Sequence, residues 1–273
     1  MLIATEIIGN VGVGVTSPQF FRANDEKIYV VKLQNNRLGA KVLVNEFIAA
    51  KFGELMDLRF PNSDFIEINA QFLERQCLNR SNIIPGRHFA SQFLEHVEYV
   101  SKHNLYKAIN TKEMAGIMLF DHIFHNADRA NNRRNLLIRP EDTGYKIYAI
   151  DNSHLFRSGR WTLASLDHLS TKIKPYYRYS FGLLLKDCLT PQDFLPYLEK
   201  VSIITNDIVE KIVREIPIEW LPSELERKVL VDFINLRCSM AVEIWDTLCK
   251  YIPREHGGHR WLFGRRINNA NFP

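Results

Sequence analysis

Three polar residues in the middle of the chain stand in an order that suits phosphoryl transfer. Asp128 follows an apolar, helix-like run, Asn135 opens an apolar segment, and Asp151 comes directly after the strand-like segment 145–150. An aspartate can orient an attacking hydroxyl or accept its proton. The side-chain oxygens of asparagine and aspartate are ligands that Mg²⁺ accepts. This order predicts one catalytic base, Asp128, followed by two metal ligands, Asn135 and Asp151.

The two apolar segments that carry these metal ligands are joined by a short stretch of turn residues. Pro140 and Gly144 bound this stretch, which favours a tight antiparallel hairpin. Hairpin pairing brings Asn135 and Asp151 to the same end, so both can face one pocket. A turn-forming aspartate or a hairpin asparagine without function is common, but three such residues in this order are not.

A glycine-rich segment near the start of the chain provides a candidate phosphate loop. Gly12 and Gly14 precede Thr16 and Ser17, and apolar segments flank all four residues. Glycine permits positive φ and a close approach of backbone N–H groups to an anion. The spacing matches neither of the common glycine-rich nucleotide-binding motifs. For this segment taken alone, an ordinary hairpin turn is therefore an equal alternative.

Lys32 and Glu46 supply the other parts of a phosphate site. Lys32 lies in Lys27–Leu33, which alternates as a strand does, and Glu46 lies in Val44–Leu55, whose apolar residues recur at helical spacing. Kinases use a strand lysine that contacts the nucleotide phosphates and is held by a helix glutamate. The alternative is a surface lysine and a surface glutamate. Their order after the glycine segment favours a catalytic interpretation, alongside Asp128.

The expected secondary structure changes character near residue 95. Residues 1–95 mix strands with a helix that buries one stripe, and residues 96–273 are mainly helical. These two ranges are the expected domains of an α+β fold. The further elements that the patterns predict are strands at 64–68 and 88–94, a loop at 74–88, a helix at 206–215, a capping box of Asn110 with Glu113, and a run from Ser223 to about Lys250.

Composition limits the classes of partner. The 273 residues are 46% hydrophobic, enough for one large or two small domains, and the net charge of +4 is low for a dedicated nucleic-acid binder. The four cysteines form no Cys-x-x-Cys pair, which argues against a disulfide framework or a zinc site. Signal-peptide features and an uninterrupted apolar run of membrane-spanning length are both missing. We therefore expect a cytoplasmic protein with no membrane or nucleic-acid partner.

Three other clusters have competing interpretations. His122 and His125 share a helix face and could form a metal site with Asp128, but a packed histidine pair is favoured. The terminal segment 254–272 mixes arginines with aromatic residues, which favours a docking tail over a binding surface. Four arginines beside the candidate base could hold phosphate or an acidic substrate, or form a solvated loop; these are Arg129, Arg133, Arg134 and Arg139.

Taken together, these segments resemble the HipA-like kinases, relatives of the phosphatidylinositol 3/4-kinases within the protein-kinase-like fold. The resemblance covers roughly residues 5–250, and its central block is more specific than its glycine segment. The segments that carry it are the glycine-rich segment ending Thr16-Ser17-Pro18, Tyr29-Val30-Val31-Lys32, Asn45-Glu46, Gly86-Arg87-His88-Phe89-Ala90-Ser91, Phe120-Asp121, Asn126-x-Asp128-Arg129, Asn135-Leu136-Leu137, Ile150-Asp151 and Ile216-Pro217-Ile218-Glu219-Trp220-Leu221.

The resemblance implies a two-lobed fold, with a small mixed α/β N-lobe and a larger, mainly helical C-lobe. It implies ATP and Mg²⁺ as cofactors, with Lys32 on the nucleotide phosphates, Asp128 as the catalytic aspartate, and Asn135 and Asp151 on Mg²⁺. It also places the adenine against a hinge near residues 91–94, where the candidate nucleotide-binding residues are Ser91, Phe93 and Leu94.

Two departures from the family pattern matter. Kinases of the usual type place the metal-binding asparagine five residues after the aspartate, whereas Asn135 is seven residues after Asp128, and Asn132 is an alternative ligand. The chain is also shorter than the full-length HipA toxin. A toxin role and an antitoxin partner are therefore not expected to carry over.

The leading hypothesis is a kinase that uses Mg²⁺ and ATP to phosphorylate a hydroxyl, with a serine or threonine of a protein as the expected acceptor. The segment Arg157–Phe181 would be an activation or substrate loop. One alternative is a pseudokinase that binds nucleotide or a partner without catalysis. Another is a phosphoinositide-type lipid kinase, although no basic amphipathic helix supports membrane attachment. The substrate protein is not named by these motifs, since loop shape and surface charge select the acceptor.

Overall fold

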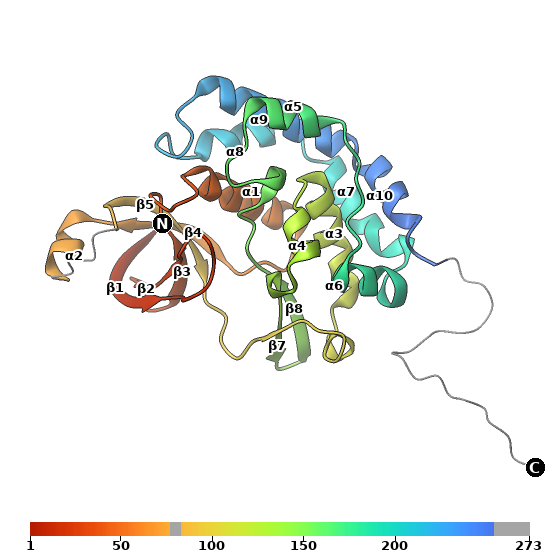
Figure 1. Ribbon diagram of the computed structural model, residues 1–273, viewed down its shortest axis with the longest axis horizontal. Coiled ribbons are helices and arrows are strands. Elements are labelled where there is room, and N and C mark those ends of the chain that lie inside the picture. Colours follow the sequence, from red (N-terminus) through yellow and green to blue (C-terminus); the bar gives the residue numbers. More distant parts are fainter. Residues whose placement is uncertain (77–82, 254–273) are drawn as a thin grey trace, which may run out of the picture.

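The computed structural model describes residues 1–76 and 83–253. Part of the expected loop at 74–88 and the terminal segment 254–272 lie outside the described residues. The described chain is a mixed α/β structure in which a β-barrel and a three-stranded sheet accompany a group of helices (Figure 1). Its hydrophobic residues form two separate cores, one inside the barrel and one among the helices.

The first five strands close into a barrel in the order β1-β2-β3-β5-β4. Its interior is apolar because alternate residues of each strand, such as Phe21, Val31 and Ile66, point inward. Antiparallel pairs join most neighbours, and a short parallel pairing of β1 with β4 closes the ring. The barrel strands are β1 (Leu2–Asn10), β2 (Gln19–Ala23), β3 (Ile28–Lys32), β4 (Ser63–Ile68) and β5 (Gly86–Gln92). The strands expected from periodicity at 27–33, 64–68 and 88–94 are thus confirmed.

The helix that follows β3 is α1 (Lys41–Met56), which confirms the helix expected at 44–55. The expectation of a single buried stripe is wrong, because the consecutive residues Val42, Leu43 and Val44 point in different directions around the helix and are all fully buried. One side of α1 contacts β5 and the other contacts helices α7 (Leu195–Ser202) and α8 (Asn206–Glu215). A helix enclosed on both sides needs apolar residues all round. Its apolar side chains belong to the helical core.

A second, three-stranded sheet carries the expected hairpin. Its order is β6 (Glu98–Tyr99), β7 (Leu136–Glu141) and β8 (Gly144–Ala149), and β7 and β8 pair antiparallel through the turn as expected. Leu136 lies opposite Ala149, and beyond that pair the N–H of Ile150 donates to the carbonyl of Asn135 at 3.0 Å. The start of β7 and the residue before Asp151 are therefore held together.

The expected capping box at Asn110 is wrong. The Asn110 side chain accepts from the N–H of Ile147 at 2.8 Å and donates to the Ile147 carbonyl at 3.0 Å. Ile147 lies on β8, an edge strand, where its backbone groups would otherwise lack a ladder partner. The amide of Asn110 matches both of those groups, so its side chain supports the hairpin and makes no cap hydrogen bond to the 3-10 helix Thr111–Glu113 that follows it.

The remaining helices pack around α1 and the hairpin. The helix expected at 206–215 is confirmed as α8, and Ser223 caps α9 by accepting from the N–H of Glu226 at 3.2 Å. The run expected from Ser223 to Lys250 is broken at Met240 into two helices, and the second packs against α3 and α7. The helices are α2 (Ala70–Arg75), α3 (Met114–Ile123), α4 (Ala127–Asn131), α5 (Leu163–Ser170), α6 (Tyr179–Leu183), α7 (Leu195–Ser202), α8 (Asn206–Glu215), α9 (Glu224–Ser239) and α10 (Ala241–Cys249). In the described part of the chain, none of them is long and apolar enough to cross a membrane.

A tryptophan between α8 and α9 fastens the barrel to the helices. Trp220 is buried, and its ring meets Phe65 of β4 edge-on with the ring centroids 5.4 Å apart. Its indole N–H donates to the carbonyl of Arg87 on β5 at 3.2 Å. This contact joins residues more than 130 positions apart and fixes the barrel relative to the helices.

Candidate active site

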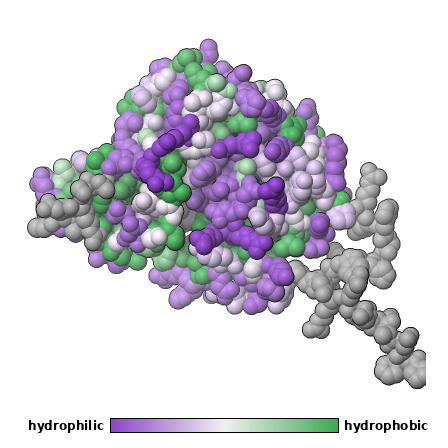
Figure 2. Space-filling model, in the orientation of Figure 1, coloured by the Kyte–Doolittle hydropathy of each residue, from purple (hydrophilic) through white to green (hydrophobic). Residues whose placement is uncertain are grey.

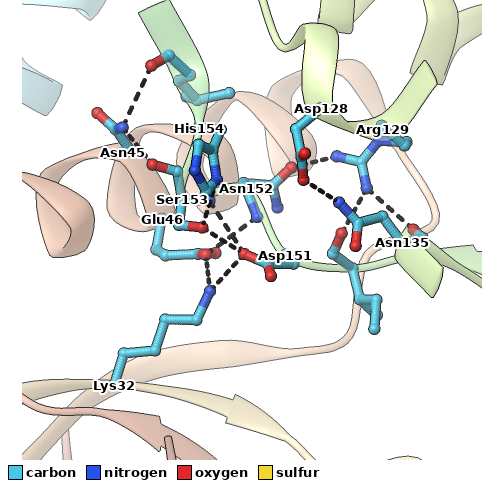
Figure 3. Close-up of polar contacts among 12 residues, drawn as sticks. Lys32, Asn45, Glu46, Asp128, Arg129, Asn135, Asp151, Asn152, Ser153 and His154 are labelled. Atoms are coloured by element: carbon cyan, nitrogen blue, oxygen red, sulfur yellow. Dashed lines mark hydrogen bonds and ion pairs between the residues drawn. The ribbon is translucent and has the colours of Figure 1, made fainter. Parts of the chain in front are cut away.

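Lys32 connects the barrel to the helices and the hairpin. It ends β3, and its Nζ contacts Glu46 Oε1 on α1 and lies 2.7 Å from Asp151 Oδ1 (Figure 3). Lys32 and Glu46 are 8% and 4% exposed, whereas the Asp151 side chain keeps 35% of its exposure. The structure thus brings together three residues from separate parts of the sequence, and only one of them opens toward solvent.

Burial and charge act in opposite directions on this triad. Burial lowers the pKa of Lys32, but the carboxylates of Asp151 and Glu46 outweigh it and raise that pKa. Burial raises the pKa of Asp151, but Lys32 and hydrogen bonds from Ser153 outweigh it and leave that pKa well below its ordinary value. Burial raises the pKa of Glu46 more than Lys32 lowers it. Asp151 is therefore an ionised carboxylate that is still accessible, which is what a metal ligand requires.

The segment that follows Asp151 is held by two neighbouring residues of α1. Glu46 accepts from the N–H of Asn152 at 3.0 Å. Asn45 accepts from the indole N–H of Trp161 at 2.9 Å, and its amide donates to three backbone carbonyls. Those carbonyls belong to Ser153 (2.8 Å), Leu155 (3.3 Å) and Ser158 (3.1 Å). Helix α1 therefore positions Asp151 on one side and the beginning of the following segment on the other.

Asp128 and Asn135 are in direct contact. Asp128 lies on α4, and the Asn135 amide donates to its Oδ2 at 2.6 Å. Asn132 donates in turn to Asn135 Oδ1 at 3.1 Å and uses its own Oδ1 to accept from the N–H of Arg134. In this arrangement both candidate asparagine ligands lie within one hydrogen-bonded chain that ends on Asp128. Neither asparagine is separated from the site.

Arg129 joins the segment that carries Asp128 to the segment that carries Asp151. Its guanidinium forms an ion pair with Asp121 at 2.8 Å, and both side chains are fully buried. It also donates to the carbonyl of Ile150 at 2.6 Å and contacts Asn152 Oδ1. Figure 3 shows it beside Asp128, near Asn135. Neither a phosphate-binding role nor a solvated loop fits Arg129, because it is buried and each of its three guanidinium nitrogens already donates inside the protein.

The glycine segment forms the loop between β1 and β2. Gly12 and Gly14 have φ of 79° and 100°, a region that side chains rarely adopt. The N–H of Ser17 donates to the Gly14 carbonyl at 3.1 Å, which makes a tight turn with Ser17 exposed and Thr16 buried. The structure therefore confirms a glycine-dependent turn, and among the described residues the hydrogen bonds of Lys32 go to Glu46 and Asp151 and not to this loop.

The three residues of the expected hinge lie at the end of β5. Ser91 pairs with Val30 and is half-buried, and the N–H of Phe93 donates to the Ile28 carbonyl at 2.9 Å. Leu94 is buried and borders a polar cavity of about 410 Å³ that is also lined by Arg139. Since the Phe93 N–H is used within the barrel, that group is not available to a ligand.

His122 and His125 are packed side chains beneath the site. His122 Nδ1 lies 2.6 Å from the Met118 carbonyl, and its Nε2 accepts from the N–H of Tyr176 at 2.8 Å. His125 has the opposite arrangement, with Nε2 3.0 Å from the Leu169 carbonyl and Nδ1 3.0 Å from the Tyr176 hydroxyl. His122 therefore needs one donor and one acceptor nitrogen, which is the neutral form, and burial lowers the pKa of both rings. The expectation of a packed pair is confirmed.

Three buried histidines, His88, His122 and His125, make the stability of the fold sensitive to acid. Burial lowers the pKa of His88 and His122 to about 4 and that of His125 to about 3, while burial raises the pKa of Asp121 to about 6. Between pH 6 and 4.5 the unfolded chain binds protons on three histidines that stay neutral in the folded chain. The folded chain binds one proton on Asp121 that the unfolded chain does not, which offsets one of the three. We expect the free energy of unfolding to fall by on the order of 2–3 kcal/mol per pH unit in that window. Urea denaturation at both pH values measures it, with exposed His103→Asn as an unchanged control. Equal stabilities at the two pH values would contradict the prediction.

The segment expected to be a loop at 157–181 contains a helix. Residues 163–170 form α5, whose Leu166 and Leu169 are buried and which packs against α9. Thr162 and Ser165 cap the helix reciprocally. The loop prediction is therefore wrong over α5, because two apolar residues three positions apart give that stretch a face to bury.

Sequence reasoning missed Asn45 and Asn152 as residues of the site. Asn45 lies within Val42–Phe47, an otherwise apolar run apart from Glu46. A polar pair in such a run must be buried with its hydrogen bonds satisfied. That pattern was the available signal for Asn45, whereas Asn152 gave none beyond its position next to Asp151.

Solved structures give an independent view of the fold. The chain is similar to the crystal structure of the Helicobacter pylori proinflammatory kinase CtkA, with a TM-score of 0.56 and 13% sequence identity over 92% of this chain and 97% of that chain. It is also similar to a chain of the Shewanella oneidensis MR-1 toxin–antitoxin complex of HipA, HipB and operator DNA, with a TM-score of 0.48 and 12% identity over 90% and 68% of the two chains. The first likeness shows a shared fold. No curated protein sequence matches this chain.

A family model decides the relationship. The model of the HipA-like kinases matches residues 4–248, which is nearly the whole described chain and close to the range 5–250 of the resemblance in sequence. That range contains the triad of Lys32, Glu46 and Asp151 and the pair of Asp128 and Asn135. This chain belongs to the HipA-like kinase family.

Proposed function

We propose that this protein transfers the γ-phosphoryl group of ATP to a serine or threonine hydroxyl of a protein, with Mg²⁺ as cofactor. The position of Lys32 between Glu46 and Asp151 carries the proposal. Protein kinases need both a lysine held by a helix glutamate and a metal-binding aspartate in place for catalysis. Family membership supports the kinase chemistry, and the protein acceptor follows from the resemblance to HipA.

In this proposal the barrel and the helical region are the two lobes of a kinase, with ATP between them. Lys32 binds the phosphates, and the loop of Gly12, Gly14, Thr16 and Ser17 covers them. Ser91, Phe93 and Leu94 border the adenine, with the Phe93 N–H excluded as a donor because Ile28 accepts it. Trp220 keeps the two lobes at a fixed separation through its contacts with β4 and β5.

The donor set suits Mg²⁺. Asp151 offers an ionised and accessible carboxylate, and Asn135 offers an amide oxygen that the amide of Asn132 now contacts. Hard oxygen donors of this kind are what Mg²⁺ takes from proteins. We assign Asp151 and Asn135 as its ligands, with Asn132 as the alternative amide. When bound, Mg²⁺ would neutralise charge on the phosphate oxygens.

Asp128 is assigned as the catalytic base. The Asn135 amide holds its Oδ2, which orients the carboxylate and leaves Oδ1 as the atom that meets the acceptor hydroxyl. Arg129 fixes the backbone on either side through the Ile150 carbonyl and Asp121. The base and the metal-binding aspartate are thus held in one rigid unit, so that a bound acceptor and a bound phosphate would be aligned without further rearrangement.

Nucleotide binding gives the first test of this function. At a concentration one hundred times its Kd, a ligand that binds only the folded state adds about 2.7 kcal/mol of stability. We expect ATP with Mg²⁺ to raise the Tm by roughly 5–10 °C, and ATP without Mg²⁺ to raise it less. Lys32→Met should lose most of the shift relative to its own baseline. A parent protein whose Tm does not respond to millimolar ATP and Mg²⁺ would overturn the proposal.

A further inference from the structure

The surface around the candidate base is strongly basic. Arg133 and Arg134 follow Asp128 closely in the chain, and Arg157 and Arg178 come from later segments; all four are exposed. We call these four arginines the basic rim. In the ranges 1–76 and 83–253, none of the four forms an ion pair with a carboxylate. Their charges are therefore available to a ligand.

Contacts place the rim beside Asp128. The guanidinium of Arg133 lies 4.5 Å from the ring centroid of Tyr179, the residue after Arg178. Helix α4, which carries Asp128, contacts α6, which begins at Tyr179. The N–H of Arg157 donates to the carbonyl of His125, three residues before Asp128, at 3.2 Å. Figure 2 shows hydrophilic residues gathered in the middle of the face seen in Figure 1, over α4 and the segment leading to α6.

We propose that the basic rim binds an acidic segment of the protein substrate, with aspartate or glutamate residues flanking the acceptor serine or threonine. This inference rests on the proposed function and names its substrate class. An acceptor hydroxyl that reaches Asp128 must bring its neighbouring residues across the rim. Arginine is the side chain best matched to carboxylates, because its planar donors bind both oxygens. Carboxylates on the acceptor peptide would supply the missing partners.

Two observations favour an acidic peptide over a nucleic acid. Proteins that bind single-stranded nucleic acid combine positive charge with aromatic faces on which the bases stack. The two exposed tyrosines here are already stacked, Tyr177 on Tyr251 at 4.6 Å between ring centroids and Tyr179 under Arg133. The net charge of the whole chain is only +4, which is low for a dedicated nucleic-acid binder, whereas the four arginines of the rim form a local basic patch. A short acidic segment fits that distribution.

The test compares two serine peptides that differ only in the charge of the flanking residues. With the full chain, ATP and Mg²⁺, we expect kcat/KM for the acidic peptide to exceed that for the basic peptide at least tenfold, and the ratio to fall as salt rises. The charge-reversed variant Arg134→Glu/Arg178→Glu should remove the preference through KM. The matched control Arg75→Glu/Lys211→Glu changes the same number of exposed charges on α2 and α8 and should keep it.

Each outcome decides the inference. Equal rates for the two peptides, or a preference that survives in Arg134→Glu/Arg178→Glu, would overturn it and leave the kinase function standing. If the two peptides react at equal rates, and single-stranded RNA competes with the acidic peptide in the parent but not in Arg134→Glu/Arg178→Glu, the rim is a nucleic-acid site. That result would also overturn the inference. A protein that binds ATP and Mg²⁺ but phosphorylates neither peptide would remove the proposed function, and this inference with it.

Discussion

Replacing Asp128 by asparagine is expected to lower kcat by a factor of roughly 10² to 10⁴, the usual contribution of a positioned acid or base. The substitution keeps the shape of the side chain but removes the oxygen charge that orients the acceptor hydroxyl. Because Asp128 does not touch Lys32 or Asp151 in the described structure, KM for ATP should change less than threefold. Initial rates of peptide phosphorylation over a range of ATP concentrations measure both quantities.

The matched control for this variant is Asp142→Asn, which makes the same change at an exposed position in the turn between β7 and β8. That variant should keep the parent's kcat. If Asp128→Asn keeps kcat within threefold of the parent, Asp128 is not the base. Loss of activity accompanied by loss of the nucleotide-dependent Tm shift would instead indicate that Asp128 acts in ATP binding.

Replacing Asp151 by asparagine is expected to remove the response to Mg²⁺. The neutral amide keeps the size of the side chain, but it no longer supplies the carboxylate that Lys32 and Ser153 hold in its ionised form. A metal contributes several kcal/mol of charge stabilisation to a transferring phosphoryl group, so kcat/KM should fall on the order of a thousandfold. Chelation of Mg²⁺ in the parent should produce a loss of similar size.

The Asp151 prediction is checked by titrating Mg²⁺ at fixed ATP in the parent, in Asp151→Asn and in Asp167→Asn. Asp167 is exposed on α5, so its variant should titrate like the parent. Glu46 remains as a partner for Lys32 in Asp151→Asn, which should keep the protein folded. A variant that still needs Mg²⁺ at the parent's concentration would show that another residue binds the metal.

The secondary structure was predictable where an element buries only one face, because its apolar residues then recur at the spacing typical of that element. Helix α8 buries Val209, Ile212 and Val213 on one side, and its bounds follow directly from that spacing. The β7–β8 hairpin was also predictable, because Pro140 and Gly144 mark its turn. In contrast, α1 is buried on both sides by partners distant in sequence, and its pattern of apolar residues alone does not reveal the second contact.

The residues that carry the candidate chemistry were predictable from the sequence. Lys32, Glu46, Asp128, Asn135 and Asp151 stand in a recognisable order, and the structure brings the first two together with Asp151 and joins the other two to each other. The buried network behind them was not predictable. The role of Arg129 depends on Asp121 and Ile150, which only the tertiary fold brings near its guanidinium.

The choice between Asn132 and Asn135 as the metal ligand was not predictable from the sequence either. Asn132 and Asn135 are both candidates from spacing, and the structure places them in one hydrogen-bonded chain with Asp128. The break of the C-terminal run at Met240 was hidden too, because both α9 and α10 have apolar residues at helical spacing. Packing of α10 against α3 and α7 decides where the second helix points.

The most direct test of the account is transfer of labelled phosphate from γ-labelled ATP. The parent and Asp128→Asn would be incubated with Mg²⁺ and the acidic serine peptide, and phosphorylated residues identified by mass spectrometry. We predict label on the peptide serine with the parent and at least a hundredfold less with the variant. A parent that binds ATP with Mg²⁺, as its Tm shift reports, but labels no hydroxyl would be a pseudokinase. Label that appears only on added phosphoinositide would assign a lipid acceptor, and either result would contradict the account.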